Sequence, residues 1–419
     1  MARIVDVRGR RVWDSRGRPT VEAEVTLKNG KRGRAIAPAG ASAGAGEAKS
    51  VEAQQAVRAI NTVIREALIG SDPRNQETID RRLVALDGTP DRARLGGNAL
   101  VAVSLACAHA AAAAARKPLW RQLAGDRKVA LPVPQIQIFG GGAHAARRVD
   151  IQDYMVICVG AGSFGESLEW TAEIYRAAGA RLARKGALCG VADEGGWWPA
   201  FRGNEQGLEE LTCAIADAGL KPGTDVAIAL DVAASQFHRD GRYHLALEGR
   251  SLSAEQLHAL LLSWIERYPI VSIEDPFAEH DAEAMSAFTR TAGSRVQVVG
   301  DDFMVTRAER VRAAAAQGAC NAVLLKPNQV GTLTETLACW RAAREAGYGG
   351  IVSARSGETE DVSIVHLAVG WGVPQLKVGS FARSERMAKW NEGLRIEEAL
   401  GADALPFPAR KLFRRYGAP

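Results

Sequence analysis

Six apolar runs, each followed by a polar side chain, constrain the fold of this chain more than any other feature. They predict strands whose carboxyl ends carry, in chain order, Asp231, Glu274, Asp301, Lys326, Arg355 with Ser356, and Lys377. After the first interval these positions recur roughly every 25 residues, the length of one strand-plus-helix unit of a (β/α)₈ barrel. Because barrel enzymes carry catalytic groups at the carboxyl ends of their strands, the pattern predicts an α/β barrel with an active site there.

The length of the chain, 419 residues, favours two domains, since one hydrophobic core rarely grows that large. Strand-like alternation followed by a Gly/Ala-rich loop and helical patterns predicts an N-terminal α+β domain over residues 1–130. Asn29-Gly30 within it is typical of a β-hairpin turn. Two prolines mark the expected boundary, and strands alternate with amphipathic helices over residues 135–419, the expected barrel.

Charge and cysteine content restrict the partners and the compartment. The net charge is +5, with a pI near 8.9, and the basic residues are spread along the chain. This favours a basic pocket for a small anion over a nucleic-acid surface. The six cysteines form no CxxC pair, which predicts free thiols in a reducing compartment. The first residues contain no apolar segment typical of a secretion signal, so a cytoplasmic protein is expected.

The segment of residues 99–115 contains no Asp, Glu, Lys or Arg and in this respect resembles a membrane-spanning helix. It consists mostly of alanine, which is only weakly apolar, and His109 interrupts it. Alanine is also the best helix former. A buried helix is therefore favoured over a membrane span, and no membrane partner is expected.

The three carboxylates at strand ends predict a metal site. Asp231, Glu274 and Asp301 offer only oxygen ligands, and no histidine or cysteine lies near them in the sequence. Oxygen-only sets suit Mg²⁺, and three carboxylates leave coordination positions open for substrate and water. The alternative is three solvated loop acids, but their shared register on successive strands argues against it.

The cationic strand ends predict a base and an anion site. Lys326 follows four apolar residues, so burial and a nearby metal ion are expected to lower its pKa toward that of a general base. Lys377 is expected to stay charged and to hold a substrate carboxylate or phosphate. Arg355 with Ser356 is typical of an anion clamp. The alternatives are salt-bridged barrel lysines and an ordinary loop arginine.

Three further residues are candidates from their surroundings. Glu194 precedes two glycines in the DEGG stretch and is a candidate acid/base opposite Lys326, with a solvated turn as the alternative. His144 follows three glycines and is a second candidate for proton transfer, although a lone histidine is more often structural. Ser42 lies in the Gly/Ala loop, where simple linker flexibility is the alternative.

Long stretches of the chain resemble the enolase (phosphopyruvate hydratase) family over essentially its whole length. The matching stretches are DSRGRPTVEAEV, GNALVAVSLA, ADEGG, ALDVAAS, SIEDPFAE, VGDD, LLKPNQVGTLTET, RSGETED and ARSERMAKWNEGLRIEEAL. The resemblance implies an α+β capping domain with a mobile loop on a modified (β/α)₈ barrel. It also implies a small phosphorylated substrate and a homodimer or larger homo-oligomer.

The resemblance further implies a role for each candidate residue. Enolase-superfamily sites are known to combine a lysine or histidine base with Mg²⁺, so this mechanism is taken from the family. Lys326 would then be the base that removes the proton alpha to the carboxylate, and Glu194 the acid that helps hydroxide to leave. Asp231, Glu274 and Asp301 would hold the first Mg²⁺, and Ser42 would help to hold a second one when substrate is bound. Lys377 would neutralise the substrate carboxylate, and Arg355 with Ser356 would bind the phosphate.

The chain departs from the family pattern near one end of the expected site. Ala354 replaces the family histidine before Arg-Ser-Gly, and Asp153 replaces the family glutamate on the water-handling side. The loop over residues 39–44 and the Trp197-Trp198 pair also differ, and Gly140 replaces an asparagine. The metal ligands and the base are unchanged, which predicts retained enolate chemistry with a changed substrate or a changed second step.

Three functions follow as expectations. Carboxyphosphonoenolpyruvate synthases, an enolase-like class from phosphonate and phosphinate antibiotic pathways, build an enolpyruvate whose phosphorus bears a carboxyl group. Ala354 would leave room for such a group, so this specialised function is placed first. The alternatives are an ordinary glycolytic enolase and a non-catalytic enolase-like binding or structural protein.

Overall fold

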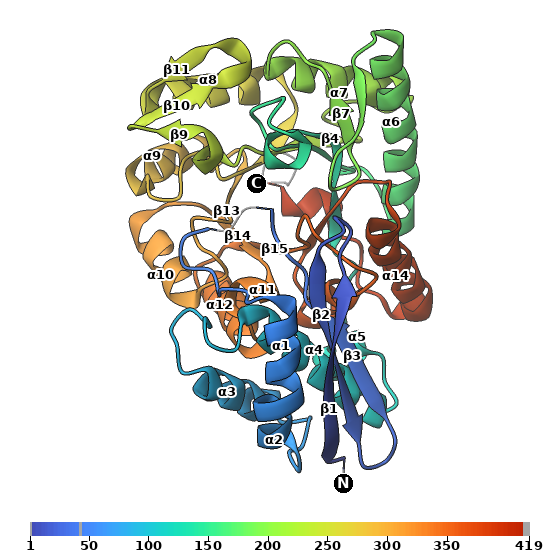
Figure 1. Ribbon diagram of the computed structural model, residues 1–419. Coiled ribbons are helices and arrows are strands. Elements are labelled where there is room, and N and C mark those ends of the chain that lie inside the picture. Colours follow the sequence, from blue (N-terminus) through green and yellow to red (C-terminus); the bar gives the residue numbers. More distant parts are fainter. Residues whose placement is uncertain (1, 42–43, 414–419) are drawn as a thin grey trace.

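The computed structural model describes residues 2–41 and 44–413, which form an N-terminal domain and a closed barrel (Figure 1). The N-terminal domain has an antiparallel sheet in the order β1 (Ile4–Trp13), β2 (Pro19–Leu27) and β3 (Arg32–Ile36). β2 and β3 form a hairpin at Asn29-Gly30, where Gly30 has a φ of 77°, so the predicted hairpin is confirmed. The helices of this domain are α1 (Ala53–Ala59), the π-helical turn η1 (Ile60–Ile64), α2 (Arg65–Leu68), α3 (Gln76–Asp87), α4 (Gly97–Ala114) and α5 (Leu119–Ala124).

Helix α4 is the alanine-rich segment, and it packs on β2 and β3. It is long and apolar enough to cross a membrane, but 83% of its residues are buried inside the protein. A Cβ atom added to Gly33 on β3 would lie 2.1 Å from the Ala110 nitrogen and 2.2 Å from the Ala106 oxygen. The small side chains therefore let helix and sheet backbones approach closely, and the predicted buried helix is confirmed.

Gly33→Ala is expected to lower the free energy of unfolding by about 1–3 kcal/mol, because the added methyl group meets helix backbone that cannot move aside. Urea denaturation of the two proteins measures the difference. Arg32→Ala, at the exposed neighbouring position, serves as the control and is expected to change stability by no more than about 0.5 kcal/mol. Equal stability of the two variants would contradict the close contact between Gly33 and α4.

Eight strands close the barrel, because β16 pairs with β4. The second strand, β5, is antiparallel to both neighbours, and the other strand pairs of the ring are parallel. The predicted α/β barrel is confirmed, with this one reversed strand. The strands of the ring are β4 (Val133–Gly140), β5 (Asp153–Ile157), β8 (Ala227–Asp231), β12 (Ile270–Glu274), β13 (Gln297–Gly300), β14 (Ala322–Leu325), β15 (Gly349–Ser353) and β16 (Gln375–Gly379).

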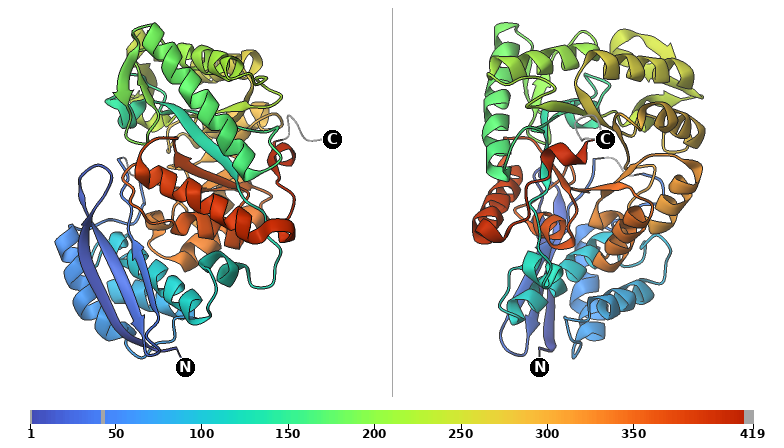
Figure 2. Two further views of the ribbon diagram at one scale, coloured as in Figure 1. Left: turned by 90° about the vertical axis from the view of Figure 1, so that its right-hand side faces the viewer. Right: turned by 180° about the vertical axis from the view of Figure 1, so that it is seen from behind.

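Helices surround the ring, as the three views in Figures 1 and 2 show. The long helices are α6 (Phe164–Arg184), α7 (Glu205–Asp217), α8 (Ala254–Arg267), α9 (Ala282–Ala292), α10 (Ala308–Gln317), α12 (Leu333–Glu345), α13 (Ser363–Trp371) and α14 (Ser384–Leu400). The short α11 (Pro327–Val330) follows β14 directly. Outside the ring, β6 (Leu188–Val191) and β7 (Trp197–Pro199) form a hairpin on β4, and β9 (His238–Arg239), β10 (Arg242–Leu245) and β11 (Arg250–Leu252) form a small sheet.

The polar residues predicted at strand ends lie at one end of the barrel. Asp231 and Glu274 are the last residues of β8 and β12, and Asp301 and Lys326 directly follow β13 and β14. The position of Lys377 was predicted wrongly, because it lies in the middle of β16 and two further residues continue the strand.

Two loops of the N-terminal domain lie against this end of the barrel. The Ser15 amide donates to the Glu358 carbonyl at 2.7 Å, and Ala39 and Gly357 exchange backbone hydrogen bonds of 2.9 and 2.8 Å. Residues far apart in the sequence therefore meet at the mouth of the barrel.

Candidate active site

The barrel mouth gathers most of the predicted site residues around one narrow cavity. Those that line it are His144, Glu194, Asp231, Asp301, Lys326, Arg355, Ser356 and Lys377. The cavity volume is about 30 Å³, room for about two water molecules, so ion pairs among the side chains take up most of the site. Glu274 and Asp153 join the group through Lys377. Ser42 lies outside the described residues.

Lys377 is the central cation of the site. Its Nζ lies 2.7 Å from Asp231 Oδ2, 2.8 Å from Glu274 Oε2 and 3.5 Å from Asp153 Oδ2. Burial alone would lower the pKa of Lys377, but the neighbouring carboxylates outweigh it and raise this pKa well above its ordinary value. The carboxylates therefore favour the charged ammonium form of Lys377, the form expected from the sequence.

Lys326 forms a buried ion pair with Asp301, and Gln329 Nε2 donates to the other oxygen of the same carboxylate at 3.0 Å. Burial lowers the pKa of Lys326, but the charge of Asp301 outweighs it and raises the pKa above its ordinary value. The expectation of a lowered pKa is therefore wrong for the protein side chains alone. A base role requires that another cation compensate Asp301.

The carboxylates fit a divalent cation. Glu274 Oε1 is buried and accepts no hydrogen bond from the described residues. Burial, and after it the negative charge of Asp231, raise the pKa of Glu274 well above its ordinary value. A bound cation would therefore offset much of the free-energy cost of keeping this carboxylate charged in the interior. All the candidate metal ligands are oxygen atoms, which suits Mg²⁺.

The three predicted metal ligands are not the most tightly grouped acids. Among residues 2–41 and 44–413, two groups of three side chains have ligand atoms that all lie within 4.8 Å of one another. One group is His144, Asp153 and Glu194, and the other is Asp275, Asp301 and Asp302. The Asp275 oxygens already accept the amides of Asp301 at 2.9 Å and Asp302 at 2.8 Å. Asp275 therefore positions the loop after β13.

His144, Asp153 and Glu194 form a buried cluster of titratable side chains. His144 Nδ1 lies 3.1 Å from Asp153 Oδ1, and its Nε2 lies 3.8 Å from Glu194 Oε1. Burial would lower the pKa of His144, but the charges of Glu194 and Asp153 raise it above its ordinary value. Gln137 also donates to Asp153. The shorter acid at position 153 therefore still orients the imidazole.

Aromatic packing holds the turn that carries Glu194. Trp197 stacks on Tyr175 with ring centres 4.5 Å apart, and its Nε1 donates to the Tyr175 carbonyl at 2.8 Å. The Tyr175 hydroxyl donates to the Gly195 carbonyl at 2.9 Å. The tryptophan that departs from the family pattern thus supports the DEGG turn.

The predicted anion clamp is occupied by a carboxylate of the N-terminal domain. Arg355 Nη1 and Nη2 donate to Glu47 at 3.0 and 3.2 Å, in the two-pronged geometry that a substrate phosphate or carboxylate would also use. Glu47 Oε1 also accepts from Gln329 at 3.1 Å. An anionic substrate must therefore displace Glu47 or approach beside it.

A second arginine reaches the clamp. Arg16 Nη1 donates to Ser356 Oγ at 3.2 Å, and the Ala41 amide donates to the same hydroxyl at 2.5 Å. The Nε and Nη2 atoms of Arg16 are buried without a hydrogen-bond partner among the described residues. Unsatisfied buried donors are costly, so they indicate a site for an anion.

Sequence reasoning assigned no role to Arg16, Glu47, Gln137 or Gln329. A local sequence pattern does not distinguish Arg16 and Glu47 from other loop charges, because their partners lie 340 and 308 positions away. Gln329 lies inside the matching stretch LLKPNQVGTLTET, three residues after Lys326, so its proximity to a predicted site residue was a usable signal, whereas no such signal marks Gln137.

These features define a class of proteins, namely barrels with one reversed strand, an N-terminal α+β domain, and acids and lysines at the mouth. Two family profiles match the chain, "Enolase, N-terminal domain" over residues 4–123 and "Enolase, C-terminal TIM barrel domain" over residues 128–414. The chain therefore belongs to the enolase family, whose members are typically Mg²⁺-dependent lyases. The resemblance seen in the sequence is confirmed at the level of the family.

Proposed function

We propose that this protein is a Mg²⁺-dependent enzyme that removes a proton alpha to a carboxylate of a small phosphorylated or phosphonylated acid. The observation that carries the proposal is the buried arrangement of Lys326 and Lys377 on the acids at the ends of β8, β12 and β13. Bound Mg²⁺ would neutralise the charge that develops on the substrate carboxylate. Asp231, Glu274 and Asp301 would hold it, with Ser42 as a candidate ligand for a second ion.

The protein side chains divide the remaining work. Lys326 takes the proton at its Nζ, and Mg²⁺ held by Asp301 would weaken the ion pair between the two side chains and so favour the neutral amine. Lys377 stays charged and binds the substrate carboxylate. His144 and Glu194, whose Nε2 and Oε1 atoms lie 3.8 Å apart, handle the proton of the leaving group, with Asp153 orienting His144.

The phosphorus end of the site favours a specialised substrate. Ala354 lines the cavity beside Arg355 and Ser356, where the family has a histidine. The Nε and Nη2 atoms of Arg16 have no hydrogen-bond partner among the described residues, so they suit an additional anionic group. We therefore place a carboxyphosphonoenolpyruvate synthase-like activity ahead of ordinary 2-phosphoglycerate dehydration, which is the second candidate because the metal acids and both lysines are present.

The test is the absorbance of enolpyruvate after the protein is mixed with Mg²⁺ and 2-phosphoglycerate. We expect little phosphoenolpyruvate from the natural chain and a gain of about tenfold or more from Ala354→His, because one positioned donor contributes about 10²–10³ in rate. Rapid turnover by the natural chain would identify an ordinary enolase instead. No gain in Ala354→His would count against the spacious phosphorus end.

Arg16→Gln is expected to raise the KM for the phosphorylated substrate about 10-fold or more with a smaller effect on kcat, because it removes a charged donor from the anion site. Inhibition by inorganic phosphate is expected to weaken in parallel. Arg18→Gln, in the same loop and exposed, is the matched control. Equal KM values for the two variants would exclude Arg16 from the anion site.

A non-catalytic binding or structural role is the third candidate. It predicts a decayed metal site and no thermal stabilisation by Mg²⁺, whereas the proposed enzyme is stabilised by an ion that binds only the folded state. A cytoplasmic location and a homo-oligomeric assembly, both usual in the family, complete the proposal.

A further inference from the structure

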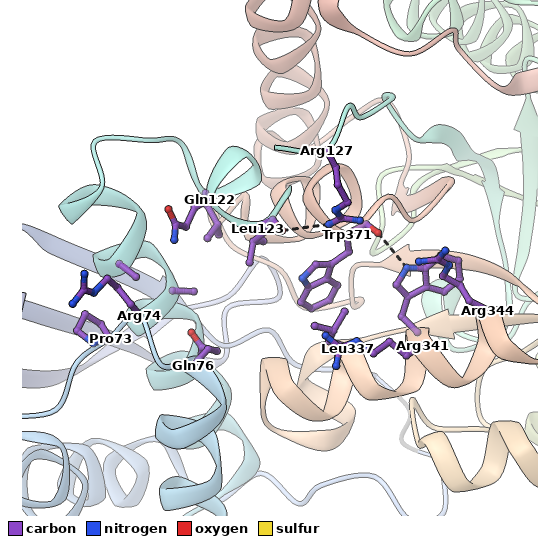
Figure 3. Close-up of a pocket in the computed structure, with 14 residues that line it drawn as sticks. Pro73, Arg74, Gln76, Gln122, Leu123, Arg127, Leu337, Arg341, Arg344 and Trp371 are labelled. Carbon is purple, nitrogen blue, oxygen red and sulfur yellow. Dashed lines mark hydrogen bonds between the residues drawn. The ribbon is translucent and has the colours of Figure 1, made fainter. Parts of the chain in front are cut away.

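A second cavity, of about 510 Å³, lies between the N-terminal domain and the barrel. Its walls come from α4, α5 and the start of α3 on one side, and from α12 and the end of α13 on the other (Figure 3). Barrel helices run opposite to the strands they cover, so these helix ends lie at the far end of the barrel from the active site. The two cavities share no lining residue, and this volume is within the range of small-molecule sites.

The cavity is strongly basic. Its lining contains no aspartate or glutamate and four arginines, Arg74, Arg127, Arg341 and Arg344. Arg74 is neutralised by Asp72, with a contact of 2.6 Å between Nη2 and Oδ2. Arg341 and Arg344 form no ion pair with any carboxylate in the part of the chain that the structure describes. They lie three positions apart on α12 and so share one face of the helix.

The floor of the cavity is apolar and aromatic. Figure 3 shows the Trp371 indole between Leu123 and Leu337, with Arg127 beside it. Two main-chain carbonyls at the end of α13 are already satisfied, because Gly370 accepts from Arg127 at 2.8 Å and Trp371 accepts from Trp340 at 3.3 Å. Because each carbonyl oxygen already accepts a hydrogen bond, its electrostatic repulsion of a bound anion is reduced.

We propose that this cavity binds an aromatic anion, a compound with a flat apolar body and a phosphate, sulfonate or carboxylate group. The flat body packs on Trp371 and the leucines, and the anionic group lies between Arg341 and Arg344, whose charges pair with no carboxylate of the described residues. The site is independent of the proposed reaction, since it uses none of the residues of the barrel mouth.

The experiment titrates the whole chain with anilinonaphthalene sulfonate, an aromatic anion whose fluorescence reports binding, and counts sites by calorimetry. We expect one site per chain and a Kd that rises at least about tenfold in the double variant Arg341→Ser/Arg344→Ser. Gln122→Glu, which places a negative charge in the cavity without a change of size, is expected to weaken binding as well. Arg290→Ser on α9, another exposed arginine, is the control and leaves Kd unchanged.

Arg341 and Arg344 are exposed, so the double variant is expected to fold, which its melting temperature verifies. Saturating Mg²⁺ with 2-phosphoglycerate is expected to leave the Kd of the probe unchanged, which separates this cavity from the barrel mouth. Absence of binding to the natural chain, competition by the phosphorylated substrate, or equal Kd values for the double variant and Arg290→Ser would each overturn the proposal.

Discussion

Lys326→Arg is expected to lower the rate of alpha-proton removal about 10²–10⁴-fold, the usual contribution of a positioned general base. Arginine keeps a positive charge beside Asp301 but does not lose its proton at accessible pH, so the variant separates the base from the ion pair. Exchange of the C2 proton of 2-phosphoglycerate for deuterium in D₂O, followed by NMR with Mg²⁺ present, measures this step without requiring dehydration.

The matched comparison is Lys326→Met, which loses both the base and the charge. We expect both variants to lose exchange, but only the methionine variant to lose stability in the absence of Mg²⁺, because it leaves Asp301 buried without its cationic partner. Exchange by Lys326→Arg at a rate close to that of the natural chain would show that Lys326 serves only as a structural counter-ion.

Lys377→Met is expected to lower the free energy of unfolding by about 3–5 kcal/mol without Mg²⁺, the usual cost of removing one partner of a buried ion pair. The reason is specific, since Asp231, Glu274 and Asp153 all contact this ammonium group and lie buried. Urea denaturation with and without Mg²⁺ measures the loss. We expect Mg²⁺ to recover part of it, because a cation on Asp231 and Glu274 replaces the missing charge.

Lys389→Met is the control for this experiment. Lys389 is as deeply buried as Lys377 and forms an ion pair of 3.0 Å with Glu358, but it contacts none of the proposed metal ligands. Its loss is expected to destabilise the protein to a similar degree, and Mg²⁺ is expected to stabilise this variant only as much as it stabilises the natural chain. A response of Lys377→Met to Mg²⁺ no larger than that of Lys389→Met would contradict the binding of the ion by Asp231 and Glu274.

Much of the candidate site could be predicted because, in a barrel, the carboxyl ends of successive parallel strands lie next to one another at one rim. Asp231, Glu274, Asp301 and Lys326 end parallel strands or directly follow them, and parallel strands in one ring bring such positions to one rim. Glu194 and His144 were found by local features, an acidic pair and glycines, although nothing in the pattern indicated that they face each other.

Other parts depended on tertiary contacts that no local pattern encodes. Asp153 reaches the rim because β5 runs opposite to its neighbours, so its first residue is paired with Asp231, the last residue of β8. Glu47 and Arg16 meet the clamp only because loops of the N-terminal domain lie over the barrel mouth. Without a metal ion, the pKa of Lys326 is raised and not lowered by burial, because the carboxylate of Asp301 lies beside it, and a sequence does not show that neighbour.

The sequence by itself determined the family, the barrel and the types of chemical group at its rim, because strand periodicity and motif spacing are local properties of the chain. Only the tertiary structure decided which charges neutralise which, since a pKa and an ion pair depend on distances across the whole fold. The arginine-lined cavity illustrates the same division, because α5, α12 and α13 supply its walls from segments more than 200 positions apart in the sequence.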